Sequence, residues 1–398
     1  MKDEQAKKQI EEFKKVIESC HVNILIGSGA SMPFLETLGN VERNITYIDN
    51  HSVEIGENLD LLKCSIYWEY LNKCILGNLF FLDSNVKHYV QKCEASKKGI
   101  VDKFISVKDE YERLVRNINQ IISARDLQLL SKQVNIFTTN VDVFLDSALE
   151  SLSCNYNDGF SGKKEVIYST DNFYKIPNKI SPHYEFKSEQ PNINLFKIHG
   201  SVNWEKGEEI GTEYKIKADY NLSTLQEIYN FCFENESKFV NYHEIDAACT
   251  QKGIEALKSL KGDEIFVDEF KKQYENIVMI NPTKQKFRDT TTNVHYYELL
   301  RIYSNHLERP NSVLFVLGFS FADEHIDKIT QRVASSNPSL LIYVLSSQKG
   351  YEDFEKKFIK YPNIRVLSAE RDYYTLADFN LQLEMVIQEL PKTSKYGK

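Results

Sequence analysis

Short runs of consecutive apolar residues recur along the chain, and polar or turn-forming residues bound each one. Such runs occupy residues 22–27, 134–140, 194–200, 276–282, 312–320, 340–347 and 364–368. Inside a run the apolar residues follow one another instead of alternating with polar ones, as in parallel strands that are covered on both faces. The pattern therefore predicts a sheet buried between two layers.

Apolar residues at helical spacing lie between several of these runs. They predict helices at residues 4–20 and 375–390, and after the runs that end at residues 140 and 320. Strands that alternate with helices in this way indicate an α/β fold. We expect a doubly wound, mostly parallel Rossmann-like sheet.

Two longer stretches, residues 52–130 and 201–272, interrupt this alternation and carry mainly helical patterns. We predict that they form one helical insertion domain, a second layer of helices. The Rossmann-like domain would then comprise residues 1–51, 131–200 and 273–398.

Composition and charge exclude several classes of protein. The 398 residues are 42% hydrophobic and 27% charged, as in a folded soluble protein, and the net charge of −8 argues against direct nucleic-acid binding. The seven cysteines form no C-x-x-C pair and no Cys/His cluster, so we expect no zinc. No apolar run reaches the roughly 18 residues of a membrane span, and the N-terminus is charged, so we expect a cytoplasmic protein without membrane contact.

Candidate chemistry lies at the ends of the predicted strands. Four groups of polar and small residues follow four of the runs: Gly27, Ser28, Gly29, Ala30 and Ser31; Thr139, Asn140 and Asp142; His199; and Gly318, Ser320 and Asp323. Because the carboxyl ends of parallel strands meet at one edge of the sheet, we expect these groups to share one ligand site.

The first group predicts contact with phosphate. Glycines at 27 and 29 remove the Cβ atoms that would keep a phosphate from main-chain N–H groups, and a following helix N-terminus would add a favourable dipole. For the other groups a structural interpretation stays open. Asp142 and Asp323 could each cap a helix, and His199 could be a buried structural side chain.

A dehydrogenase fingerprint is incomplete in this sequence. It would require a third glycine at position 32, which is Met32. Asp49 ends a possible strand about 20 residues further on, where a ribose-binding acid belongs. A nicotinamide-dependent oxidoreductase therefore stays an alternative.

Taken together and in order, the motifs "GSGAS", "TTNVD", "IHGS" and "GFSFAD" resemble the sirtuin family. This resemblance spans residues 22 to about 347 and implies NAD as the ligand. It would place the pyrophosphate on residues 27–31, the nicotinamide ribose beside Asn140 and Thr139, and the adenosine half near Gly318, Ser320 and Asp323. His199 would act on a ribose hydroxyl or on water, and Asp142 would hold the loop or contact the nicotinamide pocket.

The chain departs from sirtuin deacylases in two places. It has no zinc module of two cysteine pairs, and "MPFLE" stands at residues 32–36 where the family carries a proline-aspartate-phenylalanine-arginine run. These departures resemble the sirtuin-like branch of bacterial anti-phage systems, whose members hydrolyse NAD to nicotinamide and ADP-ribose. That resemblance implies an NAD hydrolase that forms a homo-oligomer and works with a HerA-type hexameric ATPase. An NAD-dependent protein deacylase or ADP-ribosyl transferase, and a module that only senses NAD or ADP-ribose, stay as alternatives.

Overall fold

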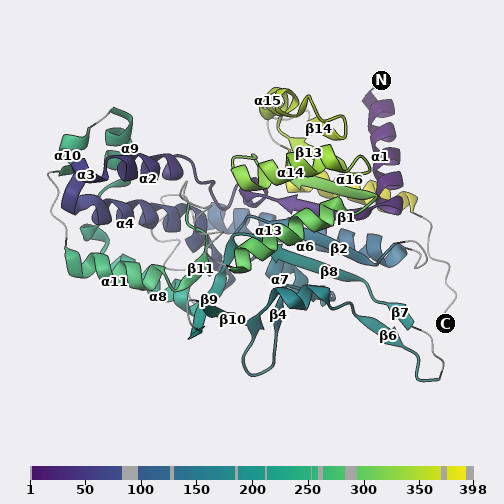
Figure 1. The fold of residues 1–398 in the computed structure, drawn as a ribbon, viewed down its shortest axis with the longest axis horizontal. Coiled ribbons are helices and arrows are strands. Elements are labelled where there is room, and N and C mark those ends of the chain that lie inside the picture. The colour runs from purple at the N-terminus through teal and green to yellow at the C-terminus, as the bar shows by residue number, and fades with distance from the viewer. Residues whose placement is uncertain are drawn as a thin grey trace.

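Seven parallel strands form the central sheet of the computed structural model (Figure 1). The structure describes residues 2–82, 97–125, 130–183, 187–210, 213–251, 253–258, 263–282, 294–368 and 374–390. In spatial order the strands are β14 (Ile364–Ser368), β13 (Leu341–Ser346), β12 (Ser312–Leu317), β1 (His21–Ile26), β2 (Gln133–Thr138), β8 (Asn192–Lys197) and β3 (Tyr156–Asn157). The predicted parallel α/β sheet is confirmed.

Helices cover both faces of this sheet. Successive side chains of a strand point to opposite faces, so a continuous apolar strand places apolar side chains on both. Ile24 packs on one face and Leu25 on the other. The Ile24 face is covered by α1 (Lys2–Ser19), α6 (Lys97–Ala124), α7 (Phe144–Ser151) and α16 (Leu376–Glu389). The Leu25 face is covered by α13 (Val294–Glu308), α14 (Glu324–Ser336) and α15 (Gln348–Phe358).

The order of the strands reverses beside β1. The chain runs from β1 outward through β2 to β8, and later returns to the other side of β1 with β12 and continues outward through β13 to β14. The connections of the two halves cover opposite faces, so the carboxyl ends of β1 and β12 flank a topological switch point. In open α/β sheets ligands bind in the crevice at this point.

A second, antiparallel sheet combines strands from before and after β8 in the chain. Its order is β11 (Ile277–Met279), β9 (Gly200–Ile210), β10 (Glu213–Ala218), β5 (Ile167–Tyr168) and β4 (Phe160–Ser161). A separate hairpin pairs β6 (Asn178–Ile180) with β7 (Lys187–Glu189).

This sheet corrects two expectations. The apolar run 276–282 pairs antiparallel with β9 and does not belong to the parallel sheet. Residues 201–210 and 213–218, expected to be helical, form β9 and β10. Residues 201–204 are all buried, and charged residues dominate the rest of the segment, so its sequence carries little strand periodicity.

A group of helices beside the sheet shares a separate core (Figure 1). It comprises α2 (Val41–Asn50), α3 (Ser52–Ile55), α4 (Leu59–Tyr70), α8 (Ser223–Glu234), α9 (Tyr242–Gln251), α10 (Ile254–Lys258) and α11 (Glu264–Tyr274). We call this group the helical layer. Single helical turns lie at Ser28–Ser31, Gly56–Asn58, Leu71–Ile75, Leu76–Phe81, Thr170–Tyr174 and Glu236–Lys238.

Two elements lie elsewhere than expected. The possible strand at 44–49 is part of helix α2, because Val41, Ile45 and Ile48 are buried at a spacing of four and three residues. Helix α6 packs on α7 and α16 over the parallel sheet and not in the helical layer. The division of the chain into two domains otherwise stays a prediction.

Within the described ranges, no helix combines the length and the apolar character that crossing a membrane requires.

Candidate functional site

A cavity with an empty volume of about 890 Å³ opens at the carboxyl ends of the central strands. The ends of β1, β2, β8 and β12 form one wall. The helical layer contributes Glu42 and Tyr70 to the other, and the segment Leu71–Ile75 contributes Cys74. The cavity therefore lies at the switch point and between the two cores.

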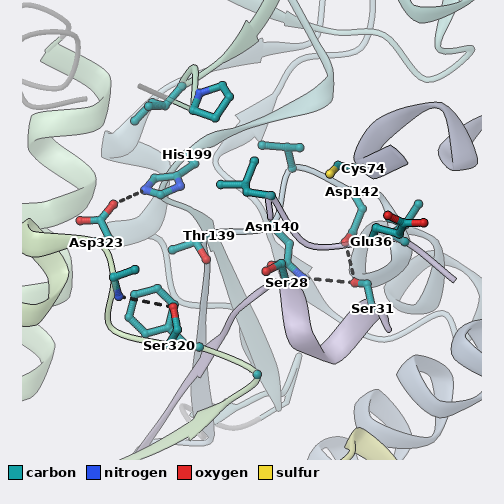
Figure 2. Close-up of a pocket in the computed structure, with 18 of the residues that line it drawn as sticks. Ser28, Ser31, Glu36, Cys74, Thr139, Asn140, Asp142, His199, Ser320 and Asp323 are labelled. Carbon is teal, nitrogen blue, oxygen red and sulfur yellow. Dashed lines mark hydrogen bonds and ion pairs between the residues drawn. The ribbon is translucent and has the colours of Figure 1, made fainter. Parts of the chain in front are cut away.

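Most of the predicted site residues line this cavity: Ser28, Ser31, Thr139, Asn140, Asp142, His199, Gly318, Ser320 and Asp323. In Figure 2, His199, Asp323 and Ser320 lie on one side, and Ser31, Asp142 and Glu36 on the other, with Asn140 between them. The tertiary structure thus brings together residues that are up to 295 positions apart in sequence (28 to 323). Gly27, Gly29 and Ala30 lie behind this wall.

The glycines of the turn after β1 were expected to allow contact with a phosphate. The structure gives them a structural function. A Cβ at Gly27 would stand 2.5 Å from the Gly318 carbonyl oxygen, and one at Gly29 would stand 3.0 Å from the Gly318 Cα. The N–H groups of Gly27 and Gly29 donate to Leu317 and Gly318 of the neighbouring strand end. Close approach of two backbones therefore explains these glycines, and a direct contact with phosphate stays a prediction.

The expectation that an α-helix begins directly at this turn, with its dipole towards the ligand, is wrong. Residues Ser28–Ser31 form a single 3-10 turn, and the next α-helix, α2, begins only at Val41. The N–H of Ala30 donates to Gly27 within the turn. The side chains of Ser28 and Ser31 are what this turn presents to the cavity.

The segment after β12 is held in a strained conformation. Gly318 has a φ of +62°, and a Cβ there would stand 2.4 Å from the Ala30 nitrogen. Phe321 also has a positive φ, of +55°, which is rare for a bulky residue, and its ring is buried against Phe319 and Phe358. Aromatic packing fixes this turn, which aims Asp323 at the cavity.

His199 is held by a carboxylate. Its Nε2 lies 3.1 Å from Oδ2 of Asp323, and the His199 side chain is only 14% exposed. Oδ1 of Asp323 meanwhile accepts from the N–H groups of His325 and Ile326 at the start of α14. Asp323 is thus a helix cap, as one interpretation held, and also the group that orients the imidazole, while its expected contact with the adenosine half of NAD stays a prediction. With Nε2–H donating, Nδ1 of the neutral ring keeps its lone pair.

Asn140 belongs to a buried hydrogen-bonded network. The Ser31 hydroxyl donates to Oδ2 of Asp142 at 2.7 Å and accepts from Nδ2 of Asn140 at 3.2 Å. Tyr111, from α6, hydrogen-bonds the same hydroxyl. Since the only proton of Ser31 goes to Asp142, Asn140 must present its nitrogen to Ser31. Its Oδ1 is buried without a hydrogen-bond partner among the described residues, at the wall of the cavity.

Asp142 is the anchor of this network. One carboxylate oxygen accepts from Ser31 and the other from the N–H of Phe144, the first residue of α7. Burial raises the pKa of Asp142, and the Ser31 hydrogen bond and the charge of Lys197 oppose that rise. Lys197, itself 3% exposed, donates to the Asp142 carbonyl oxygen. The arrangement fits a carboxylate that positions the loop.

The residues that complete the wall carry no signal in the sequence. Tyr111 gave no signal because it looks like an ordinary apolar-face residue of a long helix, and burial raises its pKa well above the usual value. Glu36, Glu42 and Cys74 come from segments that only the packing of the helical layer brings to the cavity. Burial raises the pKa of Cys74 to about 12, so it is a neutral thiol.

Two negative findings concern alternatives. Asp49, the candidate ribose acid, lies on α2, pairs with Lys63 and does not line the cavity. Asp49 therefore does not lie where a dehydrogenase fingerprint would place the ribose-binding acid. In the part of the chain that the structure describes, no three His, Cys, Asp or Glu side chains are arranged to hold a metal ion.

A scan of the chain against models of protein families gave no match. A search among curated proteins found no matching relative either. The site is therefore interpreted from its own geometry.

Proposed function

We propose that the cavity binds NAD as a substrate and that the protein hydrolyses the bond between nicotinamide and ribose. One observation carries this proposal: His199, oriented by Asp323, and Asn140, with an acceptor oxygen to spare, line one cavity at the switch point of a parallel sheet.

The lining of the cavity suits the two charges of NAD. Among the described residues, the lining includes no lysine or arginine, so we propose that the hydroxyls of Ser28 and Ser320 would hold the pyrophosphate. The pyridinium ring carries a positive charge, and the carboxylates of Glu36 and Asp142 lie on the side of the cavity away from Asp323 (Figure 2). We therefore place the ring on the Glu36 side.

The reaction needs a polar acceptor and a base. As the bond to ribose breaks, nicotinamide leaves as a neutral molecule with the bonding electron pair, and the ribose C1′ becomes oxocarbenium-like. The Asn140 Oδ1 would accept a hydrogen bond from a ribose hydroxyl and fix the sugar. His199 would take a proton through Nδ1 from the water that attacks C1′, and Asp323 would stabilise the resulting imidazolium.

The wider biological proposal rests on the four sequence motifs. By their resemblance to the sirtuin-like branch of anti-phage systems, we propose a defence effector that depletes NAD on infection. The same resemblance supports a homo-oligomer and a HerA-type ATPase as the partner. Membership of that branch is part of the proposal.

The test is to incubate the purified chain with NAD, with and without the product of the neighbouring gene, and to quantify nicotinamide and ADP-ribose by chromatography. We expect both products in equal amounts. His199→Ala and Asn140→Ala should each lower the rate on the order of 100-fold or more. His183→Ala and Asn178→Ala, at exposed positions of the β6–β7 hairpin, are the matched controls and should keep full activity.

Three results would reject or redirect the proposal. Full activity in both site variants would reject the site. Tight NAD binding without nicotinamide release would leave a sensing module. Nicotinamide release that depends on an acylated peptide or a protein acceptor would identify a deacylase or transferase.

A further inference from the structure

A second cavity lies on the far side of the loop that carries Asn140. It has an empty volume of about 800 Å³. Helix α7, strands β3 and β4, and the ends of β9 and β10 supply its wall. It shares no lining residue with the first cavity, the proposed NAD site.

Three carboxylates line this second cavity: Asp146, Glu150 and Asp158. Among the residues that the structure describes, no lysine, arginine or histidine lines it. Asp146 is paired from behind with the buried Lys197 at 2.5 Å, so Asp158 and Glu150 are the carboxylates left to face the cavity. Asp158 is fixed in place because its Oδ1 accepts from the N–H of Phe160.

Burial and neighbouring carboxylates both act on the titratable groups of this cavity. Burial, with the nearby charge of Asp146, raises the pKa of Asp158 to about 6. The pKa values of Tyr156 and Tyr220 are raised by burial and by the surrounding carboxylates. A cation in the cavity would relieve this accumulation of charge.

Aromatic side chains complete the wall. Tyr156, Phe160 and Tyr220 line the same cavity, from β3, β4 and the segment after β10. Aromatic rings attract a cation through their negative faces, and rings combined with carboxylates are the usual recognition of an alkylammonium head. A metal ion would instead need several oxygen ligands gathered at one point, which the described residues do not form.

A side-chain amide oxygen at the wall of this cavity has no hydrogen-bond donor among the described residues. Asn203 lines the cavity and is 8% exposed. Its Nδ2 donates to Asp146 at 3.4 Å, and its Oδ1 is buried without a hydrogen-bond partner among the described residues. A buried amide oxygen without a donor costs free energy, so a ligand with an N–H group would satisfy it.

We propose that this second cavity is a binding site for an alkylammonium group. The ammonium would donate to Asn203 and lie against Asp158 and Glu150, with its carbon chain between the rings of Tyr156 and Tyr220. The group could belong to a free polyamine or to a lysine side chain of a partner, and both share this chemistry. The proposal is independent of the proposed NAD chemistry.

The experiment is isothermal titration calorimetry on the full chain. Spermidine and a peptide with one central lysine are the two probes, and n-butylammonium and n-butanol are compared as a cation and its neutral analogue. We expect saturable binding of the amines and none of n-butanol. Asp158→Asn, which keeps the Oδ1 acceptor for Phe160, should weaken binding at least about tenfold. Tyr220→Ala should weaken it roughly threefold to thirtyfold.

Glu165→Gln is the matched control, since it removes one carboxylate from the exposed connection between β4 and β5, outside the cavity. Its affinity should stay that of the natural chain. Tighter binding of spermidine would identify a free polyamine as the ligand, and tighter binding of the peptide a lysine side chain. No saturable binding of any amine, or equal binding by Asp158→Asn and Glu165→Gln, would overturn the proposal. Glu150→Gln, on the exposed side of α7, provides a second variant should Asp158→Asn fail to fold.

Discussion

At the scale of single residues, the site depends on side chains that each make two different polar contacts. Asp323 caps α14 through Oδ1 and holds His199 through Oδ2. Ser31 donates to Asp142 and accepts from Asn140. Each pairing fixes the proton position of its neighbour, so the tautomer of His199 and the orientation of the Asn140 amide follow from hydrogen bonding.

Asp323→Asn separates these tasks. The amide oxygen still caps α14, but the amide nitrogen presents a donor to Nε2, so His199 must carry its proton on Nδ1 and can no longer accept one there. We expect the kcat for NAD hydrolysis to fall about 100-fold or more. The KM for NAD and the melting temperature should change little. Steady-state kinetics with a thermal melt will measure this.

Glu324→Gln, an exposed residue one position along that pairs with Lys328 on the surface, is the control for Asp323→Asn. It should leave kcat unchanged. Equal kcat values in the two variants would mean that His199 does not act as the base.

At the scale of elements, the ends of two neighbouring strands determine the shape of the cavity. The turn after β1 and the turn after β12 touch backbone to backbone at Gly27, Gly29 and Gly318. Any side chain at these points would push the two strand ends apart. Since Ser28 and Ser31 follow β1 and Ser320 follows β12, such a shift would open the proposed substrate site.

Gly27→Ala tests this contact. The φ of Gly27 is −111°, which alanine adopts without strain, so the cost comes from the collision of its Cβ with the Gly318 carbonyl and with Phe319. We expect the free energy of unfolding to fall by about 1–3 kcal/mol. NAD affinity should be lost at the same time, as measured by calorimetry alongside chemical denaturation.

Gly56→Ala offers the contrasting control. Gly56 has a φ of +65° with no atom within 4 Å of an added Cβ, in the helical layer away from the cavity. Its cost should be conformational, roughly 1–2 kcal/mol, without a change in NAD affinity. If Gly27→Ala bound NAD normally, the strand-end contact would have no bearing on the site.

At the scale of the whole molecule, a buried polar ladder crosses the central sheet. Asn194 donates to Asn135, Asn135 donates to Asn23, and Asn23 donates to the Val313 carbonyl, which links β8, β2, β1 and β12. The three asparagines are register partners on adjacent strands. His306 from α13 joins the ladder through Nδ1, 3.0 Å from Nδ2 of Asn135.

The ladder makes global stability depend on pH. Burial, with Arg309 and His21 nearby, lowers the pKa of His306 to about 3, below the 6.5 of the unfolded chain. Below pH 6.5 His306 therefore binds a proton in the unfolded state but not in the folded state. We expect this residue to lower the free energy of unfolding by about 1.4 kcal/mol per pH unit at most, between pH 6.5 and about 3.

Denaturation with urea at pH 7.5, 6.5 and 5.5 will measure this effect in the natural chain, His306→Gln and the exposed-site control His183→Gln. The difference between His306→Gln and the natural chain should shift in favour of the variant as the pH falls. His183→Gln should track the natural chain at every pH. Parallel pH profiles for all three proteins would contradict a neutral, buried His306.

Sequence alone was enough to predict the parallel α/β sheet, because continuous apolar runs at 22–27, 134–140 and 312–320 are typical of strands covered on both faces. It also determined that Asn140, His199 and Asp323 follow strand ends. The local pattern misread 201–218 and 44–49, since short segments with mixed charge carry weak periodicity and the final choice depends on what covers each face.

The contacts of those residues follow from how distant elements pack in the folded chain. The glycines at 27 and 29 looked like a phosphate contact, and their true neighbour is Gly318, a partner nearly three hundred positions away. Tyr111, Glu36 and the second cavity arise from the packing of helices and sheets against one another. Sequence periodicity reports which face of an element is buried, and contacts between distant elements depend on how those faces meet.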